Sequence, residues 1–297
     1  MIDWSSYNRS LVKRGELLFS YDFLDVWDLD LARMNRNKKG KKYKYPESFI
    51  LVIGHIRLYF HLPYRQTQGI IKATVGKRLP DHPSYSQISR RVNKLKIDIN
   101  SITDGDDTII AIDSTGIKVT NRGQWMHDKW GGVTNKKKGY LKIHVAVNIK
   151  TKEILVLEVT DEKVYDGKMM RKLVDNVLDD RHHNKKVKCV LADGAYDSNE
   201  NFIFLKEKRI KPVIKVKRNS IISHKNSKTR NDEVRQQTKD FLKWKRKRRY
   251  GHRWMAETAF SSIKRMFGEH VSSTRFQNMV KEMMLRVSLY NMFRRMT

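Results

Sequence analysis

The stretch TIIAIDSTGIKV, residues 108–119, decides the fold class of this chain. It is a run of apolar and β-branched side chains of the kind that forms a strand in the interior of a sheet. Asp113 stands inside this run. A buried carboxylate costs free energy unless it is paired, binds a metal or lies where a site opens. The same stretch therefore predicts a candidate functional acid.

Four further strand patterns follow, with helical patterns between the later ones. The strands are predicted at 141–148 (LKIHVAVN), 154–159 (ILVLEV), 187–192 and 212–216, and the helices at 167–180 and 199–208. The turn IKTKE between the first two of these strands is short enough for an antiparallel meander. The later alternation of helix and strand then indicates a mixed α/β sheet.

Residues 1–100 differ from this pattern, because they show helix-like periodicity and no convincing strand alternation. Two short helices, each beginning at a proline, are predicted at 63–75 and 83–95. The pair has the layout of a helix-turn-helix DNA reader, and it fits ordinary helical packing equally well. We therefore expect a helical region at 1–100 for DNA binding or dimerisation, followed by an α/β domain at 101–297.

The composition narrows the range of partners. The chain of 297 residues carries 62 Lys and Arg against 32 Asp and Glu, a formal net charge of +30. Such a charge repels itself unless a polyanion compensates it, so nucleic acid is the expected partner. Membrane-surface binding is the competing interpretation, which no apolar run of about 18 residues supports. The single cysteine excludes an internal disulfide, and the N-terminus lacks the pattern of a signal peptide, so a cytoplasmic protein is expected.

Two more acidic residues, Asp193 and Glu257, are candidates to lie near Asp113. Asp193 follows the predicted strand 187–192, at the carboxyl end where ligands of α/β sheets gather. Glu257 lies within a predicted helix. Three carboxylates of this origin favour hard divalent cations. Each acid also has a structural explanation, in backbone hydrogen bonds, helix capping and pairing with Arg253 respectively.

The segment YGHRWMAETAFSSIK, residues 250–264, places four polar side chains on one predicted helix face. Tyr250, Arg253, Glu257 and Lys264 follow one another at spacings of three, four and seven. On an α-helix these spacings correspond to an arc of roughly 60°. A carboxylate flanked by cations and a phenol suits a metal ion beside a phosphate. The simpler alternative is an exposed helix with an Arg–Glu pair.

Residues 205–256 are the most basic part of the chain, with nineteen Lys or Arg and four Asp or Glu. Their segment 217–250 directly precedes the helix of Glu257. Within it, the polar tract 223–232 is expected to be a mobile loop, and WKRKRRY at 244–250 offers phosphate contacts. Such a run is also typical of a solvated face or a localisation signal. The candidate contacts are Lys245, Arg246, Arg248 and Arg249.

Aromatic and histidine side chains add further candidates. Trp125 lies in the loop GQWMHDKWGG after the first strand. There it would either stack on a base beside Asp113 or pack against the core. His144 falls inside a strand pattern, so a packed or hydrogen-bonded histidine is expected rather than a metal ligand.

Taken together, these blocks resemble the DDE transposases of prokaryotic insertion sequences, in the group that spans insertion-sequence families four and five. The family signature Y-x2-R-x3-E-x6-K matches Tyr250, Arg253, Glu257 and Lys264. The blocks AIDSTGIK and LADGAYDS resemble the segments that carry the first and second aspartates. Because YNRSLVKRG, LPYRQTQG and PSYSQISRRV also resemble the N-terminal part of the family, the resemblance covers nearly the whole chain.

The resemblance implies an RNase H-like (retroviral-integrase-like) fold: a mixed five-stranded sheet with flanking helices, preceded by an all-helical N-terminal domain. It implies that Asp113, Asp193 and Glu257 hold two Mg²⁺ or Mn²⁺ ions. With them the protein would catalyse cleavage and strand transfer at the inverted-repeat ends of an element. The implied partners are double-stranded DNA, from element ends and target, and a second copy of the chain in a synaptic complex.

Within that mechanism, Arg253 and Lys264 would neutralise phosphate oxygens, and the hydroxyl of Tyr250 would orient a phosphate. Asp193 and Glu257 stand 64 positions apart. This leaves no room for a large β-rich insertion such as some relatives carry there, so the basic segment is either a small substitute or a linker.

Two rival functions use the same residues. A structure-selective nuclease on an RNase H-like fold would need the acids but would not join strands. A DNA-binding protein derived from a transposase would recognise element ends without catalysis, and the three intact acids argue against it.

Overall fold

The computed structural model describes residues 3–76, 78–79, 81–99, 108–119, 140–179 and 186–296. The chain forms two compact units, one of Met1–Asp98 with Ser273–Thr297 and one of Ile99–Ser272. The predicted loop around Trp125 lies outside the described residues. Within the described ranges, no helix is both long enough and apolar enough to cross a bilayer.

The first unit is helical throughout its described part. Its elements are α1 (Trp4–Leu18), η1 (Asp22–Leu24), α2 (Trp27–Asn35), α3 (Glu47–Tyr59), α4 (Tyr64–Thr74), α5 (Tyr85–Val92) and α12 (Phe276–Arg295). The centre of this unit is α3, because its side chains Phe49, Ile50 and Ile53 are almost fully buried and α2, α4, α5 and α12 contact it. The helices predicted at 63–75 and 83–95 are present as α4 and α5.

The C-terminal helix α12 belongs to this first unit, whereas the sequence pattern predicted a single α/β domain at 101–297. Its side chains Met283, Leu289 and Phe293 are buried, and the Phe293 ring lies 5.6 Å from that of Tyr59 on α3. Burial of apolar area stabilises a helix wherever a complementary face exists. Periodicity shows that a helix has an apolar face but not which helix covers it.

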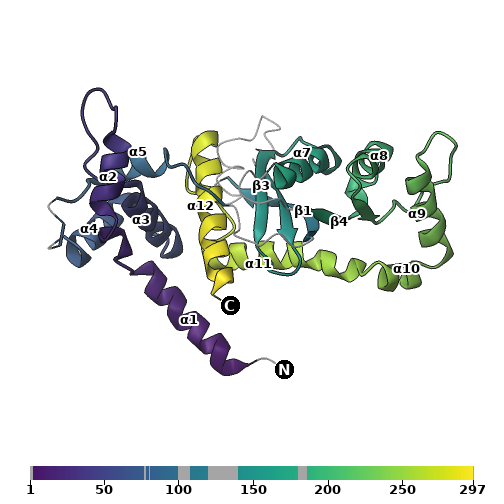
Figure 1. Ribbon diagram of the computed structural model, residues 1–297, viewed down its shortest axis with the longest axis horizontal. Helices are drawn as coiled ribbons and strands as arrows, with labels where there is room; N and C mark the ends of the chain where they lie inside the picture. Colours follow the sequence, from purple (N-terminus) through teal and green to yellow (C-terminus); the bar gives the residue numbers. More distant parts are fainter. Residues whose placement is uncertain are drawn as a thin grey trace, which may run out of the picture. The chain divides into compact units, whose positions relative to one another are not determined.

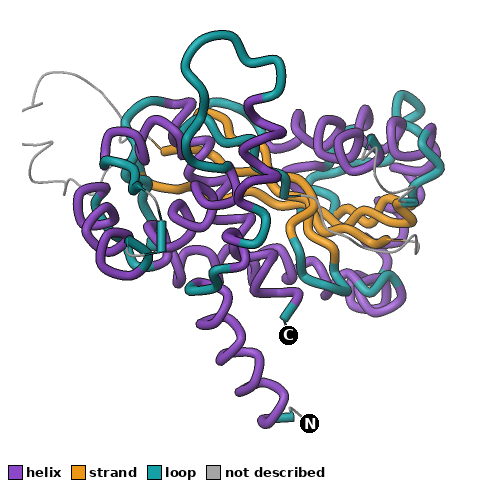
Figure 2. The backbone as a smooth tube through the Cα atoms, turned by 60° about the vertical axis from the view of Figure 1, so that its left-hand side comes forward, coloured by secondary structure: helices purple, strands orange, loops and turns teal. Residues whose placement is uncertain are grey.

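The second unit contains a five-stranded sheet in the order β3-β2-β1-β4-β5. The strands are β1 (Thr108–Lys118), β2 (Tyr140–Asn148), β3 (Ile154–Asp161), β4 (Val187–Ala192) and β5 (Lys211–Ile214). The first three are antiparallel neighbours, and β4 and β5 continue from β1 in parallel; Figure 2 shows them as one twisted sheet. This mixed sheet with its flanking helices confirms the RNase H-like fold class, and each predicted strand is present.

Helices cover both faces of this sheet. They are α7 (Asp166–Leu178), α8 (Asn199–Glu207), α9 (Lys228–Lys239), α10 (Phe241–Lys247) and α11 (Trp254–Phe267), with short turns η2 (Gly194–Tyr196) and η3 (Tyr250–Arg253). One core forms between α7, α8 and inward side chains such as Ile110 and Ile112. On the other side of the sheet, α11 packs on β1 and β2 (Figure 1). Since successive side chains of a strand point to opposite faces, Asp113 faces α11 and Ser114 faces α7.

The polar tract at 223–232 is partly helical, which corrects the expectation of a mobile loop. Helix α9 begins at Lys228, and the Ser227 hydroxyl caps it by accepting a hydrogen bond from the Arg230 N–H. A short and strongly polar helix is marginal by itself in water. Tertiary contacts must therefore hold it, and these are not visible in the local sequence.

A buried ion pair supplies such a contact. Arg230 donates from Nε to Oδ1 of Asp197 at 2.8 Å, and the two side chains are 12% and 0% exposed. The Ser220 hydroxyl and the Lys217 N–H both donate to Oδ2 of Asp197. Burial by itself would raise the pKa of Asp197, but these donors together hold it below its usual value. The loop after β4 is thus fastened to the segment that leads to α9.

Replacing Asp197 with Asn should destabilise the protein by about 3–5 kcal/mol, because it leaves the Arg230 guanidinium buried without a counter-charge. Urea unfolding followed by circular dichroism measures this. The control is Asp232→Asn, since Asp232 pairs with Arg235 at the surface, where the two side chains are 41% and 64% exposed. That change should cost less than about 1 kcal/mol. Equal destabilisation of both variants would contradict the role given to the buried pair.

Candidate active site

Strand pairing brings the two aspartates together. The parallel register sets Ala111 of β1 opposite Leu191 of β4. Two residues further along, Asp113 within β1 and Asp193 just after β4 therefore lie side by side on the same face of the sheet, and the charge of Asp193 acts on Asp113. Asp193 also caps the next turn, because its Oδ1 accepts the Ala195 N–H at 2.9 Å. Asp193 therefore caps this turn and lies beside Asp113 at the same time, so the structural and the functional explanation of this residue are compatible.

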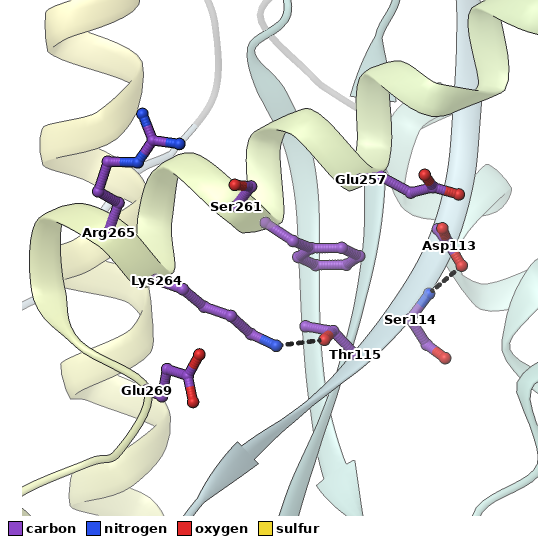
Figure 3. Close-up of a pocket in the computed structure, with 9 residues that line it drawn as sticks. Asp113, Ser114, Thr115, Glu257, Ser261, Lys264, Arg265 and Glu269 are labelled. Atoms are coloured by element: carbon purple, nitrogen blue, oxygen red, sulfur yellow. Dashed lines mark hydrogen bonds between the residues drawn. The ribbon is translucent and has the colours of Figure 1, made fainter.

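Arg253 connects Asp113 with Glu257. Its Nη1 donates to Oδ2 of Asp113 at 2.9 Å, and its Nη2 pairs with Oε1 of Glu257. Figure 3 shows the two carboxylates turned toward each other, one from β1 and one from the first turn of α11. The side chain of Asp113 is 14% exposed and that of Glu257 is 55% exposed. Within the described ranges, no three His, Cys, Asp or Glu side chains converge into a metal site as they stand.

Asp113 carries a perturbed pKa. Burial raises the pKa of Asp113 to about 6, and the negative charges of Asp193 and Glu257 also raise it. The Ser114 N–H, which donates to Oδ1 at 2.9 Å, and the Arg253 guanidinium act in the opposite direction. Because burial prevails, this carboxylate has less positive charge around it than its ionised form requires.

An open hollow of about 510 Å³ lies between β1 and α11. The Lys264 ammonium donates to the Thr115 hydroxyl at 2.9 Å, so this helix position is tied to the same strand as Asp113. In Figure 3, Asp113 and Glu257 stand at one end of the hollow, and Lys264 and Arg265 stand toward the other. Acids beside cations in an open recess suit the binding of a phosphodiester.

The sequence predicted that Tyr250 lies on the same helix as Glu257. In the structure it precedes helix α11. Arg249 adopts a left-handed backbone with φ 51°, and the turn η3 that follows interrupts the helical phase. The Tyr250 ring is 7% exposed and packs 5.1 Å from that of Trp244. Its hydroxyl interacts with Arg253, and burial raises its pKa to about 12. Tyr250 therefore supports Arg253 rather than presenting an open hydroxyl.

Three of the four basic side chains proposed as phosphate contacts are exposed, namely Lys245, Arg246 and Arg249. The fourth, Arg248, turns inward and pairs at 2.5 Å with Glu233, whose side chain is 4% exposed. Trp244 is buried and donates from Nε1 to the other oxygen of Glu233 at 2.5 Å. Arg248 thus joins α10 to α9. The sequence reveals no such pairing, because Glu233 lies in a different helix.

A polar network lies on the α7 side of β1, and no motif in the sequence predicts it. The Ser114 hydroxyl donates to Oδ1 of Asp166 at 2.6 Å, and Lys142 pairs with the same oxygen at 2.8 Å. His144 is fully buried, its Nε2 lies 3.0 Å from the Thr160 hydroxyl, and burial lowers its pKa to about 4. This confirms a hydrogen-bonded histidine. The network fixes Ser114, whose N–H donates to Asp113. Ser114 and Asp166 are 52 residues apart in the sequence, and no motif indicates that they meet.

Replacing Asp113 with Asn should stabilise the metal-free protein at alkaline pH, although Arg253 then keeps only Glu257 as its acidic partner. A carboxyl whose pKa is raised by folding costs nothing while it is protonated in both states. The cost grows as the pH rises from the ordinary pKa of 3.8 to the raised pKa of about 6, and it is fully present above that. The gain should be on the order of 1 kcal/mol at about pH 8 and should vanish near about pH 4.

Urea unfolding at the two pH values, with a chelator present, measures this gain. The matched control is Glu269→Gln, because the side chain of Glu269 is 63% exposed and should show no such pH dependence. An Asp113→Asn variant that is less stable than the wild type at both pH values would contradict the burial argument.

The chain is similar to proteins of a known family. A family model described as a transposase DDE domain matches residues 104–292, and a second model of the same description matches residues 12–122. Among solved structures, the piggyBac transposase synaptic complex with hairpin DNA is similar with a TM-score of 0.42 and 10% identity, over 95% of this chain and 74% of that one. The Drosophila P element transposase strand transfer complex gives a TM-score of 0.33 and 11% identity, over 65% of this chain and 46% of that one. Because the first family model spans more than half of the chain, the protein belongs to the DDE transposases.

Proposed function

We propose that this chain is the transposase of a prokaryotic insertion sequence, which cuts DNA at the ends of its element and joins them to a target. The observation that carries the proposal is the meeting of acids around Arg253. Strand pairing sets Asp113 beside Asp193, and Arg253 connects Asp113 with Glu257 from the helix. Carboxylates that open onto a hollow lined by cations, in a protein of net charge +30, suit phosphoryl transfer on DNA.

The donor set fits a hard divalent cation. All three acids offer carboxylate oxygens, which Mg²⁺ and Mn²⁺ prefer. Burial raises the pKa of Asp113 to about 6 despite the Arg253 guanidinium, so a cation bound at this carboxylate would stabilise its ionised form. Asp113, Asp193 and Glu257 would hold two ions, and bound ions of this kind activate an attacking oxygen and stabilise a leaving oxygen.

The cations of the chain would place the phosphate. Arg253 has a planar fork suited to two phosphate oxygens. The fork pairs with Asp113 and Glu257 in this structure, and the Tyr250 hydroxyl also contacts Arg253, so a phosphate would reach the fork once bound cations hold the two acids. Lys264 stands on the same helix, anchored to Thr115. Cutting and joining each break one P–O bond and form another, with water as the attacking group in the first step and the freed 3′-hydroxyl in the second. One site therefore serves both reactions without a protein nucleophile.

The exposed cations Lys245, Arg246 and Arg249 supply a surface for the DNA backbone before it reaches the acids. Trp254 is 55% exposed and lies one helical turn before Glu257. Its aromatic face could stack on a base, which is the role that the sequence suggested for Trp125. We also assign to α4 and α5 the recognition of the inverted repeat, since their pairing matches the predicted helix-turn-helix layout.

The proposed partners are the two inverted-repeat ends, a target duplex and a second copy of this chain, all met in the cytoplasm. Two copies follow from the chemistry, because two ends must be cut and joined to one target. A nuclease is the second candidate, because the same acids would cleave DNA without joining it.

Glu257→Gln should abolish cutting and joining of a labelled duplex that carries the flanked element end, in Mg²⁺ or Mn²⁺. We expect a loss of at least roughly 10³-fold for a group that acts with its neighbours as a unit. Binding of the duplex without metal should stay within a few-fold, because Gln keeps the shape of the side chain. The matched control is Glu269→Gln, which changes an acid lining the same hollow and should keep near wild-type activity.

The outcomes separate the candidate functions. Full activity of the Glu257→Gln variant would remove Glu257 from the site. Cleavage without joined products in the wild type would favour the nuclease, and specific binding without any cleavage would favour a DNA-binding protein derived from a transposase.

Replacing Lys245 and Arg246 together with Ala should weaken DNA binding uniformly across sequences. It should also lower the slope of log Kd against log salt by about 2, because each of the two side chains neutralises about one phosphate. Fluorescence anisotropy over a salt series measures this. The control of equal charge replaces Lys172 and Lys208, which pair with Glu158 and Asp175 on the α7 side of the sheet. An equal slope change in the control would assign the effect to net charge alone.

A further inference from the structure

The start of helix α7 contacts the strand that carries the first aspartate of the site. The Ser114 hydroxyl donates to Oδ1 of Asp166, the first residue of the helix, at 2.6 Å. The N–H of the same serine donates to Oδ1 of Asp113 at 2.9 Å, the bond drawn as a dashed line in Figure 3. Lys142 of β2 pairs with Asp166 at 2.8 Å and also donates to the Val164 carbonyl at 3.0 Å, so two strands hold this end of α7.

The next residue of the helix contacts the turn that follows Asp193. The Gly167 carbonyl accepts a hydrogen bond from Nδ2 of Asn201 at 3.1 Å, and the same nitrogen donates its other hydrogen to the Tyr196 carbonyl in η2 at 2.9 Å. Asn201 is 6% exposed and Tyr196 is 1% exposed, so these contacts lie in the interior. A Cβ at position 167 would stand 3.0 Å from the Ala195 carbonyl oxygen, closer than such atoms ordinarily approach. The N–H of Ala195 in turn donates to Oδ1 of Asp193.

We propose that Asp166 and Asn201 are positioning residues of the metal site, which set the separation between the two aspartate carboxylates. They act through Ser114 on the side of Asp113 and through the turn η2 on the side of Asp193. The two contacts meet at consecutive residues of α7, joined by one rigid peptide bond. Strand pairing alone does not fix this separation, because the paired residues of β1 and β4 end at positions 111 and 191, two before each acid.

We refer to Ser114, Asp166, Gly167 and Asn201 as the α7 bracket. The proposal rests on the proposed function in one respect, the binding of divalent cations by the acids. Mg²⁺ requires a near-ideal octahedron of oxygen ligands at short distances, whereas Ca²⁺ accepts flexible arrangements. A fixed separation of two carboxylates therefore favours the smaller ion. Groups that orient metal ligands in this indirect way change metal affinity by roughly 10–100-fold when they are removed.

Ser114→Ala and Asn201→Ala test the bracket from its two sides. The readout is the electron paramagnetic resonance signal of free Mn²⁺, which measures Mn²⁺ binding to the full-length protein without DNA. Each variant should raise the Kd for Mn²⁺ roughly tenfold, and Asp166→Ala should match Ser114→Ala because it removes the acceptor of the same bond. Competition against Mn²⁺ should show that Mg²⁺ loses more affinity than Ca²⁺. The double variant of Ser114 and Asn201 should bind as either single variant does, since releasing one side already frees the separation.

The matched control is Asn176→Ala. Asn176 also ties α7 to the sheet, because its Nδ2 donates to Glu158 of β3 at 2.9 Å, but it lies near the other end of the helix. This variant should keep the wild-type Kd. If the bracket variants lower the midpoint of urea unfolding without changing the Kd for Mn²⁺, the contacts are structural only and the proposal is wrong. Single effects that multiply in the double variant would also overturn it, because the two sides would then act independently.

Failure of the proposed function gives a different pattern. Asp113→Asn removes a proposed ligand and should abolish the Mn²⁺ binding that Ser114→Ala only weakens. A wild type that binds no Mn²⁺, or an Asp113→Asn variant that binds it as the wild type does, would show that the metal site itself is wrong. Loss of binding in Asp113→Asn beside unchanged binding in the bracket variants would remove only the positioning role.

Discussion

Asp113 carries its charge in the middle of a strand whose neighbours Ala111 and Ile112 are fully buried, and this charge has to be compensated. Arg253 compensates it in part by linking the strand to Glu257 on α11. Tyr250 and the turn η3 hold Arg253, so the basic segment before α11 matters for the site through its backbone as well as its charge. Burial nevertheless raises the pKa of Asp113 to about 6.

Polar contacts fasten the sheet to its surroundings on both sides of the site. Behind β1, Asp166 holds the Ser114 hydroxyl, and Ser114 in turn donates its N–H to Asp113. After β4, Asp197 anchors Arg230 of α9. Asp166 thus holds the strand of Asp113, and Asp197 holds the loop that follows Asp193. Such partly buried ionic contacts hold a site in one geometry more than they add to net stability.

Much of this could be predicted because strand patterns are local. The β-branched runs predicted every strand, the alternation of helices and strands predicted the mixed sheet, and each acid stood at a strand interior, a strand end or a helix face. The errors concern contacts between distant segments. Arg248 and Tyr250 looked like surface groups in a basic run, but Glu233 and Trp244 bury them. The tract at 223–232 looked like a loop, since the partner that stabilises α9 lies at Asp197.

Periodicity and composition predicted the mixed α/β sheet, the basic character of the chain and three candidate acids in order along it, and the resemblance to DDE transposases implied the RNase H-like fold class. Only the tertiary packing decided which side chains and helices lie next to one another. Strand register set Asp113 beside Asp193, a left-handed residue moved Tyr250 off the helix, and packing on α3 drew α12 into the first unit. These outcomes depend on burying apolar area and pairing charges between segments far apart in the chain, and no local pattern records which segments will meet.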